Sequence, residues 1–254
     1  MSTKTTIVAV ALVMLMIFVP WLLPTGDRVA LAQFKDAIGR VKTVTYTETW
    51  STPNVDFKRP ENSRSTIFGG SEVDIIRRIS ILGKHLQRTE YVQPNNGIIT
   101  IINLKTGEHA SIHTKQKRFV RLTKQVVWDR ETGGKTETEI VARPLADLYA
   151  EIIRLPKGDV ENLPARKIGG RDAVGFRRIE KRGKDTWTRT YWVDAMSRLP
   201  IRIEVSHRST AAQISPSDWV MSDFVFDKPM SEKLFDLTPP ADYEVVEEKI
   251  YGFK

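Results

Sequence analysis

The sequence predicts a mainly β protein with a few helices, of the α+β class, preceded by one N-terminal hydrophobic helix. Residues 7–23 form an uncharged apolar run, and side chains of alternating polarity recur from Thr43 onward, a period of two that is typical of strands. The 254 residues are 41% hydrophobic and 28% charged, which suits one globular domain with a buried core. We divide the chain into a transmembrane anchor or signal segment, residues 1–26, and one domain, residues 27–254.

The apolar run predicts export from the cytoplasm. Lys4 precedes it, and Asp27 and Arg28 follow it. A helix over residues 7–23 would span roughly 25 Å, against about 30 Å for the hydrocarbon core of a membrane. Because the positive end stays in the cytoplasm, the domain is expected outside it.

Two interpretations of this segment stay open. Ala30-Leu31-Ala32 has the small-residue pattern of a signal-peptidase site, which would release a soluble periplasmic protein. The triplet lies inside a predicted helix, residues 28–40, so cleavage would destroy the start of that helix. We therefore favour an uncleaved anchor in a bacterial inner membrane, with the N-terminus cytoplasmic and the domain periplasmic. The apolar face of the predicted helix comprises Ala30, Phe34, Ala37, Ile38 and Val41.

Alternation predicts antiparallel strands joined by glycine turns. On one strand Tyr46, Glu48 and Trp50 share a face, opposite a row of threonines. Turns are predicted at the glycine pairs 133–134 and 169–170 and at Gly183. The predicted strands cover residues 43–50, 98–104, 109–113, 119–122, 172–180, 186–194, 199–206 and 219–226. In the strand 199–206 the core side is assigned to Leu199, Ile201, Ile203 and Val205.

A central helix is predicted over residues 145–155, between Pro144 and Pro156. A shorter helix is predicted to begin at a Ser231 cap and to end before Pro239. The apolar stripe of the central helix comprises Leu145, Leu148, Tyr149, Ile152 and Leu155.

The sequence gives no sign of an enzyme. It has no Gly-x-Ser-x-Gly, no glycine-rich phosphate loop and no His-Glu-x-x-His, and it has no cysteine. His109 and His113 lie on a predicted strand, about 13 Å apart, which is too far to share a metal ion. We predict no catalytic residue, no metal and no cofactor. The net charge of +8 is spread through patches of mixed sign, so nucleic acid is not an expected partner.

The order of these elements resembles the LolA-like superfamily, which comprises outer-membrane lipoprotein-sorting proteins and periplasmic sensors that regulate anti-sigma factors. The resemblance covers about residues 28–246. Its most characteristic part is the stretch 191–204, a Trp-Val-Asp strand that turns and returns as Leu-Pro-Ile-Arg-Ile-Glu. The other matching stretches are residues 41–46, 102–107, 145–155, 170–176, 224–227 and 234–240.

This resemblance implies a half-open antiparallel β-barrel whose concave face is covered by helices and accommodates acyl chains. It implies binding of an apolar ligand, and together with the missing catalytic motifs it predicts a non-enzymatic envelope protein that binds a lipid or an acylated, lipoprotein-like ligand. The N-terminal helix makes the membrane a further expected partner. The alternative is a membrane-tethered signalling or assembly module that binds another envelope protein, with the barrel filled by its own side chains. The candidate cavity-lining residues are Tyr46, Trp50, Ile99, Ile101, Leu148, Ile152, Tyr191 and Phe224.

Overall fold

We describe the fold from a computed structural model, whose described residues are 26–51, 75–93, 97–128, 135–139, 148–155, 160–210 and 217–253. Within these ranges the chain forms two helices, one short 3-10 helix and thirteen strands of a single sheet. The predicted N-terminal hydrophobic helix lies outside the described residues, as do the glycine pair 133–134 and the prolines that bound the central helix. Among the described helices, none is long and apolar enough to cross a membrane.

The strands follow the alternation of the sequence closely. Each predicted strand is present, and the hairpin turn at residues 169–170 uses two glycines with φ of +54° and +80°, which other residues rarely adopt. The helices are α2 (Gly26–Arg40) and α3 (Leu148–Ile153), and the 3-10 helix is η1 (Glu232–Phe235), capped by Ser231 as predicted. The strands are β1 (Thr43–Ser51), β2 (Ile75–Leu82), β3 (Leu86–Gln93), β4 (Ile98–Asn103), β5 (His109–His113), β6 (Arg118–Trp128), β7 (Lys135–Glu139), β8 (Val160–Ile168), β9 (Arg171–Arg182), β10 (Asp185–Asp194), β11 (Pro200–Ser209), β12 (Ser217–Phe226) and β13 (Glu244–Phe253).

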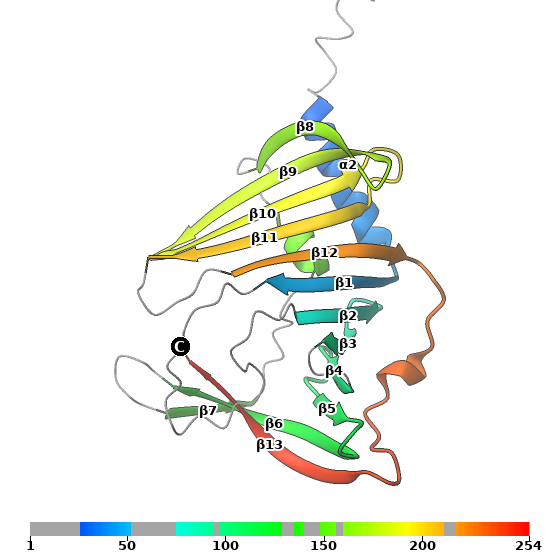
Figure 1. Ribbon diagram of the computed structural model, residues 1–254, viewed down its shortest axis with the longest axis vertical. Helices are drawn as coiled ribbons and strands as arrows, with labels where there is room; N and C mark the ends of the chain where they lie inside the picture. The colour runs from blue at the N-terminus through cyan, green and yellow to red at the C-terminus, as the bar shows by residue number, and fades with distance from the viewer. Residues whose placement is uncertain are drawn as a thin grey trace, which may run out of the picture.

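The sheet is open. Its strand order is β13-β6-β5-β4-β3-β2-β1-β12-β11-β10-β9-β8, with β7 paired to β6, and β8 lies at the end of the sheet opposite β13 (Figure 1). All described pairings are antiparallel except that of β13 with β6. The prediction of a mainly β fold with an open antiparallel sheet is therefore confirmed at this level of detail.

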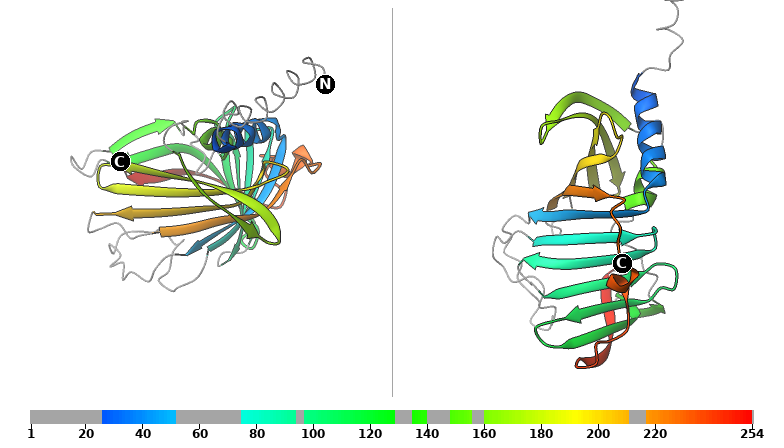
Figure 2. Two further views of the ribbon diagram at one scale, coloured as in Figure 1. Left: turned by 90° about the horizontal axis from the view of Figure 1, so that it is seen from above. Right: turned by 90° about the vertical axis from the view of Figure 1, so that its right-hand side faces the viewer.

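Both helices pack on one face of the sheet, which we call the helix face; the opposite side is the outer face (Figure 2). Phe34 and Ile38 of α2 have no exposed surface, and neither has Ile152 of α3. Their spacing follows the predicted apolar faces of both helices. Each such side chain contributes about 1.5–3 kcal/mol on burial, so the main core lies between these helices and the sheet.

One predicted orientation is wrong. Ile203 and Val205 of β11 belong to the main core, and Leu199 packs against it, but Ile201 does not. A bulge between Trp192 and Val193 shifts the register of β10 against β11. Because one extra residue turns the neighbouring side chain to the other face, Ile201 packs instead with Trp192 and Ala173 in a second cluster.

Trp192 occupies its place in the second cluster because Gly175 has no side chain. A Cβ at residue 175 would lie 2.6 Å from the indole of Trp192. The guanidinium of Arg166 also lies over this indole, 3.6 Å from the ring centroid. The outer face thus has its own small cluster, separate from the main core.

The connection from β12 to β13, residues 227–243, covers part of the outer face (Figure 1). Arg88 lies on this face and donates through Nη1 to the carbonyl of Leu234, at 2.9 Å. Asp227 accepts from the backbone N–H of Lys42 at 2.8 Å at the start of the connection. Phe235 of η1 is buried, and so is Phe119 of β6.

Candidate functional site

The structure places six of the eight candidate residues on the helix face. Tyr46, Leu148, Ile152 and Tyr191 are almost fully buried in the main core. Phe224 is half-buried and its ring stacks on Tyr46, with 5.2 Å between the centroids. Trp50, also half-buried, packs at the margin of the core.

Ile99 and Ile101 are not brought together with the other six. Ile101 pairs with Arg88 of β3 and with Ala110 of β5, and Ile99 pairs with Ile112, all on the outer face. The strand β4 is apolar on both faces, so its sequence did not distinguish them. The β4 residues that share the helix face are Ile98, Thr100 and Ile102.

Near Tyr191 the chain fills the helix face with its own side chains. The ring of Phe34 lies 6.1 Å from that of Phe176 and 6.0 Å from that of Tyr191. Burial and the neighbouring Glu151 carboxylate raise the pKa of Tyr191, so its hydroxyl stays protonated and donates to Glu151 Oε1 at 2.6 Å. Arg189 Nε forms an ion pair with the same oxygen at 2.7 Å. These contacts hold α3 against the sheet.

At the other end of the same strands, aromatic rings lie across the helix face, with Tyr91 joined to the others through the guanidinium of Arg77. We call Trp187, His207, Trp219, Trp50 and Tyr91 the aromatic row. Trp187 stacks on His207 with 4.1 Å between centroids, and Trp219 meets Trp187 edge-on at 5.7 Å. Trp219 stacks on its cross-strand partner Trp50 at 4.4 Å.

The row is positioned by strand register and lies partly open. It crosses the ends of β1, β3 and β11 and the beginnings of β10 and β12, within the consecutive strands β3-β2-β1-β12-β11-β10 of the sheet (Figure 1). Trp187, Trp50 and Tyr91 are half-buried, whereas Trp219 and His207 are buried. Stacked and edge-on aromatic pairs are favourable by about 0.5–1.5 kcal/mol beyond their burial. The row is therefore a preformed apolar surface.

A buried ion pair lies beside the row. Arg77 of β2 pairs across the sheet with both Glu48 and Tyr91. Its Nη2 donates to Glu48 Oε2 at 2.7 Å, and both side chains are buried. Burial raises the pKa of Glu48, and the Arg77 guanidinium opposes that rise. The guanidinium also lies over the Trp50 ring, 5.0 Å from its centroid, and over Tyr91 at 5.8 Å.

Sequence reasoning missed Arg77, although a signal was present. In β2 the buried positions are Ile75, Arg77, Ile79 and Ile81, so one charge interrupts an apolar face. Glu48 interrupts the apolar face of β1 in the same way. A charge at such a position needs a partner, and two such strands predict a cross-strand ion pair.

A second titratable group, half-buried but with a buried ring nitrogen, lies on the helix face farther along the sheet. His109 of β5 pairs with Ile102 and Leu122 across its two neighbouring strands. Burial lowers the pKa of His109 to about 4, and its Nε2 has no hydrogen-bond partner among the residues described. The imidazole is therefore neutral at pH 7.

This burial predicts a pH-dependent stability. Between pH 6.5 and 4 the unfolded His109 binds a proton that the folded one excludes, so the free energy of unfolding should fall as the pH falls, by up to about 3 kcal/mol from this group. In His109→Leu that contribution is absent. We expect urea unfolding at pH 7 and pH 4.5 to show a smaller difference for the variant than for the original chain; equal differences would contradict the burial of a neutral imidazole.

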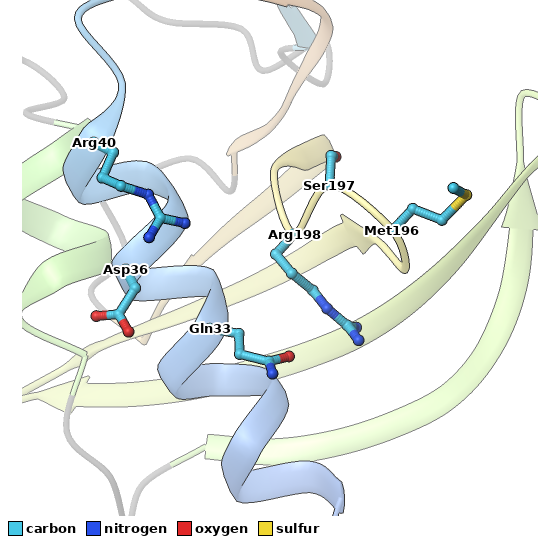
Figure 3. Close-up of a pocket in the computed structure, with 6 residues that line it drawn as sticks. All are labelled: Gln33, Asp36, Arg40, Met196, Ser197 and Arg198. Carbon is cyan, nitrogen blue, oxygen red and sulfur yellow. The ribbon is translucent and has the colours of Figure 1, made fainter.

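A pocket of about 460 Å³ lies between α2 and the turn from β10 to β11 (Figure 3). Its lining is mostly polar, with Met196 turned away into solvent and 94% exposed. It lacks the apolar walls that an acyl chain needs. The lining residues are Gln33, Asp36, Arg40, Met196, Ser197 and Arg198.

No protein-family model matches the chain, and no curated protein matches it. Among solved structures, the chain is similar to the lipoprotein LppX of Mycobacterium tuberculosis, at 10% identity over 80% of this chain and 96% of that one, with a TM-score of 0.44. It is similar to LprF of Mycobacterium bovis, at 9% identity over 87% and 99%, with a TM-score of 0.43. It is also similar to the LolA superfamily protein NE2245 of Nitrosomonas europaea, at 11% identity over 82% and 96%, with a TM-score of 0.31. These likenesses leave the function to be inferred from the site itself.

Proposed function

We propose that this chain is a non-enzymatic protein of the bacterial cell envelope that binds a lipid or an acylated ligand along the aromatic row. The apolar run at residues 7–23 would hold it in the inner membrane, with the domain in the periplasm. An acyl chain is the expected ligand because the row offers apolar ring surface.

The half-burial of Trp50, Trp187 and Tyr91 is the observation that carries this proposal. The helix face near Tyr191 is closed by side chains of α2 and α3, whereas these three rings keep accessible surface. Each methylene that leaves water contributes about 0.8 kcal/mol, so several carbons lying on the row would offset the cost of association.

The second candidate is a tethered module that binds another envelope protein. It is favoured by the filled core. Tyr46, Leu148, Ile152 and Tyr191 are buried in one cluster of the protein's own side chains, so this part of the helix face needs no ligand to cover it. In that case the row would be part of a protein interface, where tryptophan and tyrosine are common.

A photoactivatable acyl lipid distinguishes the two candidates. The full chain would be reconstituted in vesicles that contain a trace of the probe, irradiated, and mapped by peptide mass spectrometry. We expect saturable labelling of peptides from β1, β10 and β12. Labelling confined to the N-terminal apolar run would overturn the lipid-binding proposal.

Two tryptophans of one strand provide a matched pair of variants. Trp187 lies in the row, and Trp192 lies in the second cluster on the outer face. Trp187→Leu should reduce labelling by about tenfold, because removing a large apolar contact costs at least about 1.4 kcal/mol. Trp192→Leu should leave labelling unchanged, and equal losses in both variants would indicate a general effect on folding.

A further inference from the structure

Beside the aromatic row lies a charged hydrogen-bond donor, Arg77 Nε–H, that has no partner among the described residues; the Nε1–H of Trp50 in the row has none either. Arg77 is 9% exposed, and its Nη2 donates to Glu48. Its Nε–H is buried and has no hydrogen-bond partner in the part of the chain that the structure describes. A buried donor without a partner is costly, so such a group in a native protein calls for an explanation.

The surroundings of this donor are suited to the polar end of an apolar molecule. The half-buried rings of Trp50 and Tyr91 flank the guanidinium. A molecule that lies on these rings would place its first polar atom beside Arg77. Among the described residues the one carboxylate paired with Arg77 is bound through Nη2, so a ligand acceptor at Nε would add a hydrogen bond without breaking that pair.

The charge of the site selects the kind of acceptor. The guanidinium of Arg77 is neutralised by the Glu48 carboxylate 2.7 Å away, so the pair has no net charge. A free carboxylate or a phosphate would be repelled by Glu48 at close range and would lose its hydration. A carbonyl oxygen accepts a hydrogen bond without either cost.

We propose that the Nε–H of Arg77 binds the carbonyl oxygen of an ester-linked acyl chain that lies on the aromatic row. This inference rests on the proposed function, since it names the ligand class for the same site. It makes Arg77 the residue that distinguishes ester lipids from ether lipids and from free fatty acids.

Two photoactivatable probes test the proposal on the full chain in vesicles: a monoacylglycerol and the matching monoalkylglycerol ether. They share chain length, diazirine position and charge, and differ in the carbonyl alone. We expect the ester to label β1 and β12 about tenfold more than the ether, as one hydrogen bond to a charged donor predicts. In Arg77→Lys, which keeps the positive charge beside Glu48, labelling by the two probes should become equal.

Arg78→Lys is the matched control, because Arg78 is the next residue of β2 and is exposed on the outer face. It should retain the preference for the ester. Equal labelling of the original chain by ester and ether would overturn the role of Arg77 and leave the proposed function standing. If neither probe labels the row, the proposed function fails. If a free fatty acid displaces the ester at equal concentration, the site binds anions, and the proposal of a neutral acceptor is wrong.

Discussion

Replacing Phe34 with alanine is expected to lower the free energy of unfolding by about 3–5 kcal/mol, the range found for large-to-small changes in a core. Phe34 has no exposed surface, and its ring contacts Phe176 of β9 and Tyr191 of β10. Truncation would leave a cavity between α2 and the sheet that these rings cannot fill without moving. The loss should appear in denaturant unfolding of the full chain in a mild detergent, followed by far-UV circular dichroism.

The control is Gln33→Ala, the preceding residue of α2, which is exposed at the polar pocket. It should change stability by less than about 0.5 kcal/mol. If Phe34→Ala were equally mild, α2 would not be docked on the helix face, and the main core would lie elsewhere.

The period of the sequence predicted the elements better than it predicted their contacts. Strands with clean alternation, such as β1 and β10, were found within a residue or two of their bounds. The strands β2, β3, β7, β8 and β13 were not predicted. In β8 the exposed positions outnumber the others, because it is an edge strand with only β9 beside it among the described strands. With so few apolar side chains, β8 shows no clear period of two.

The faces of individual residues depended on features that a single strand does not encode. Opposite the step from Trp192 to Val193, β11 has one extra residue, Ile201, and this bulge turns Ile201 to the outer face. Ile99 and Ile101 are covered on the side of the 227–243 connection, which is remote in sequence. Of the candidate site, the sequence identified Trp50, but it gave no reason to choose Trp50 over Tyr46, which is buried in the core.

The aromatic row and the ion pair could not be predicted from the sequence for a related reason. Trp187, Trp219 and Trp50 come from three strands, and Trp50 joins the other two only because β1 inserts between β2 and β12. This insertion brings the N-terminal strand beside one near the C-terminus. A long-range pairing of this kind is a property of topology, which local periodicity does not determine.

Removing one partner of the Glu48–Arg77 pair is expected to cost as much as emptying part of the core. Arg77→Met leaves the Glu48 carboxylate buried without a partner, and Glu48→Gln leaves a buried guanidinium, so each should lower the free energy of unfolding by about 3–5 kcal/mol. The double variant removes both charges and should lie within about 1 kcal/mol of the original chain.

Burial raises the pKa of Glu48, and without Arg77 nothing in the pair opposes that rise. The folded Arg77→Met variant then binds a proton more readily than its unfolded chain, so its deficit should shrink as the pH falls through the raised pKa. Urea unfolding of the four chains at pH 8 and pH 5 measures both effects. Additive losses in the double variant, or a deficit that does not change with pH, would show that the two side chains are solvated and that Arg77 is not the buried donor of the aromatic row.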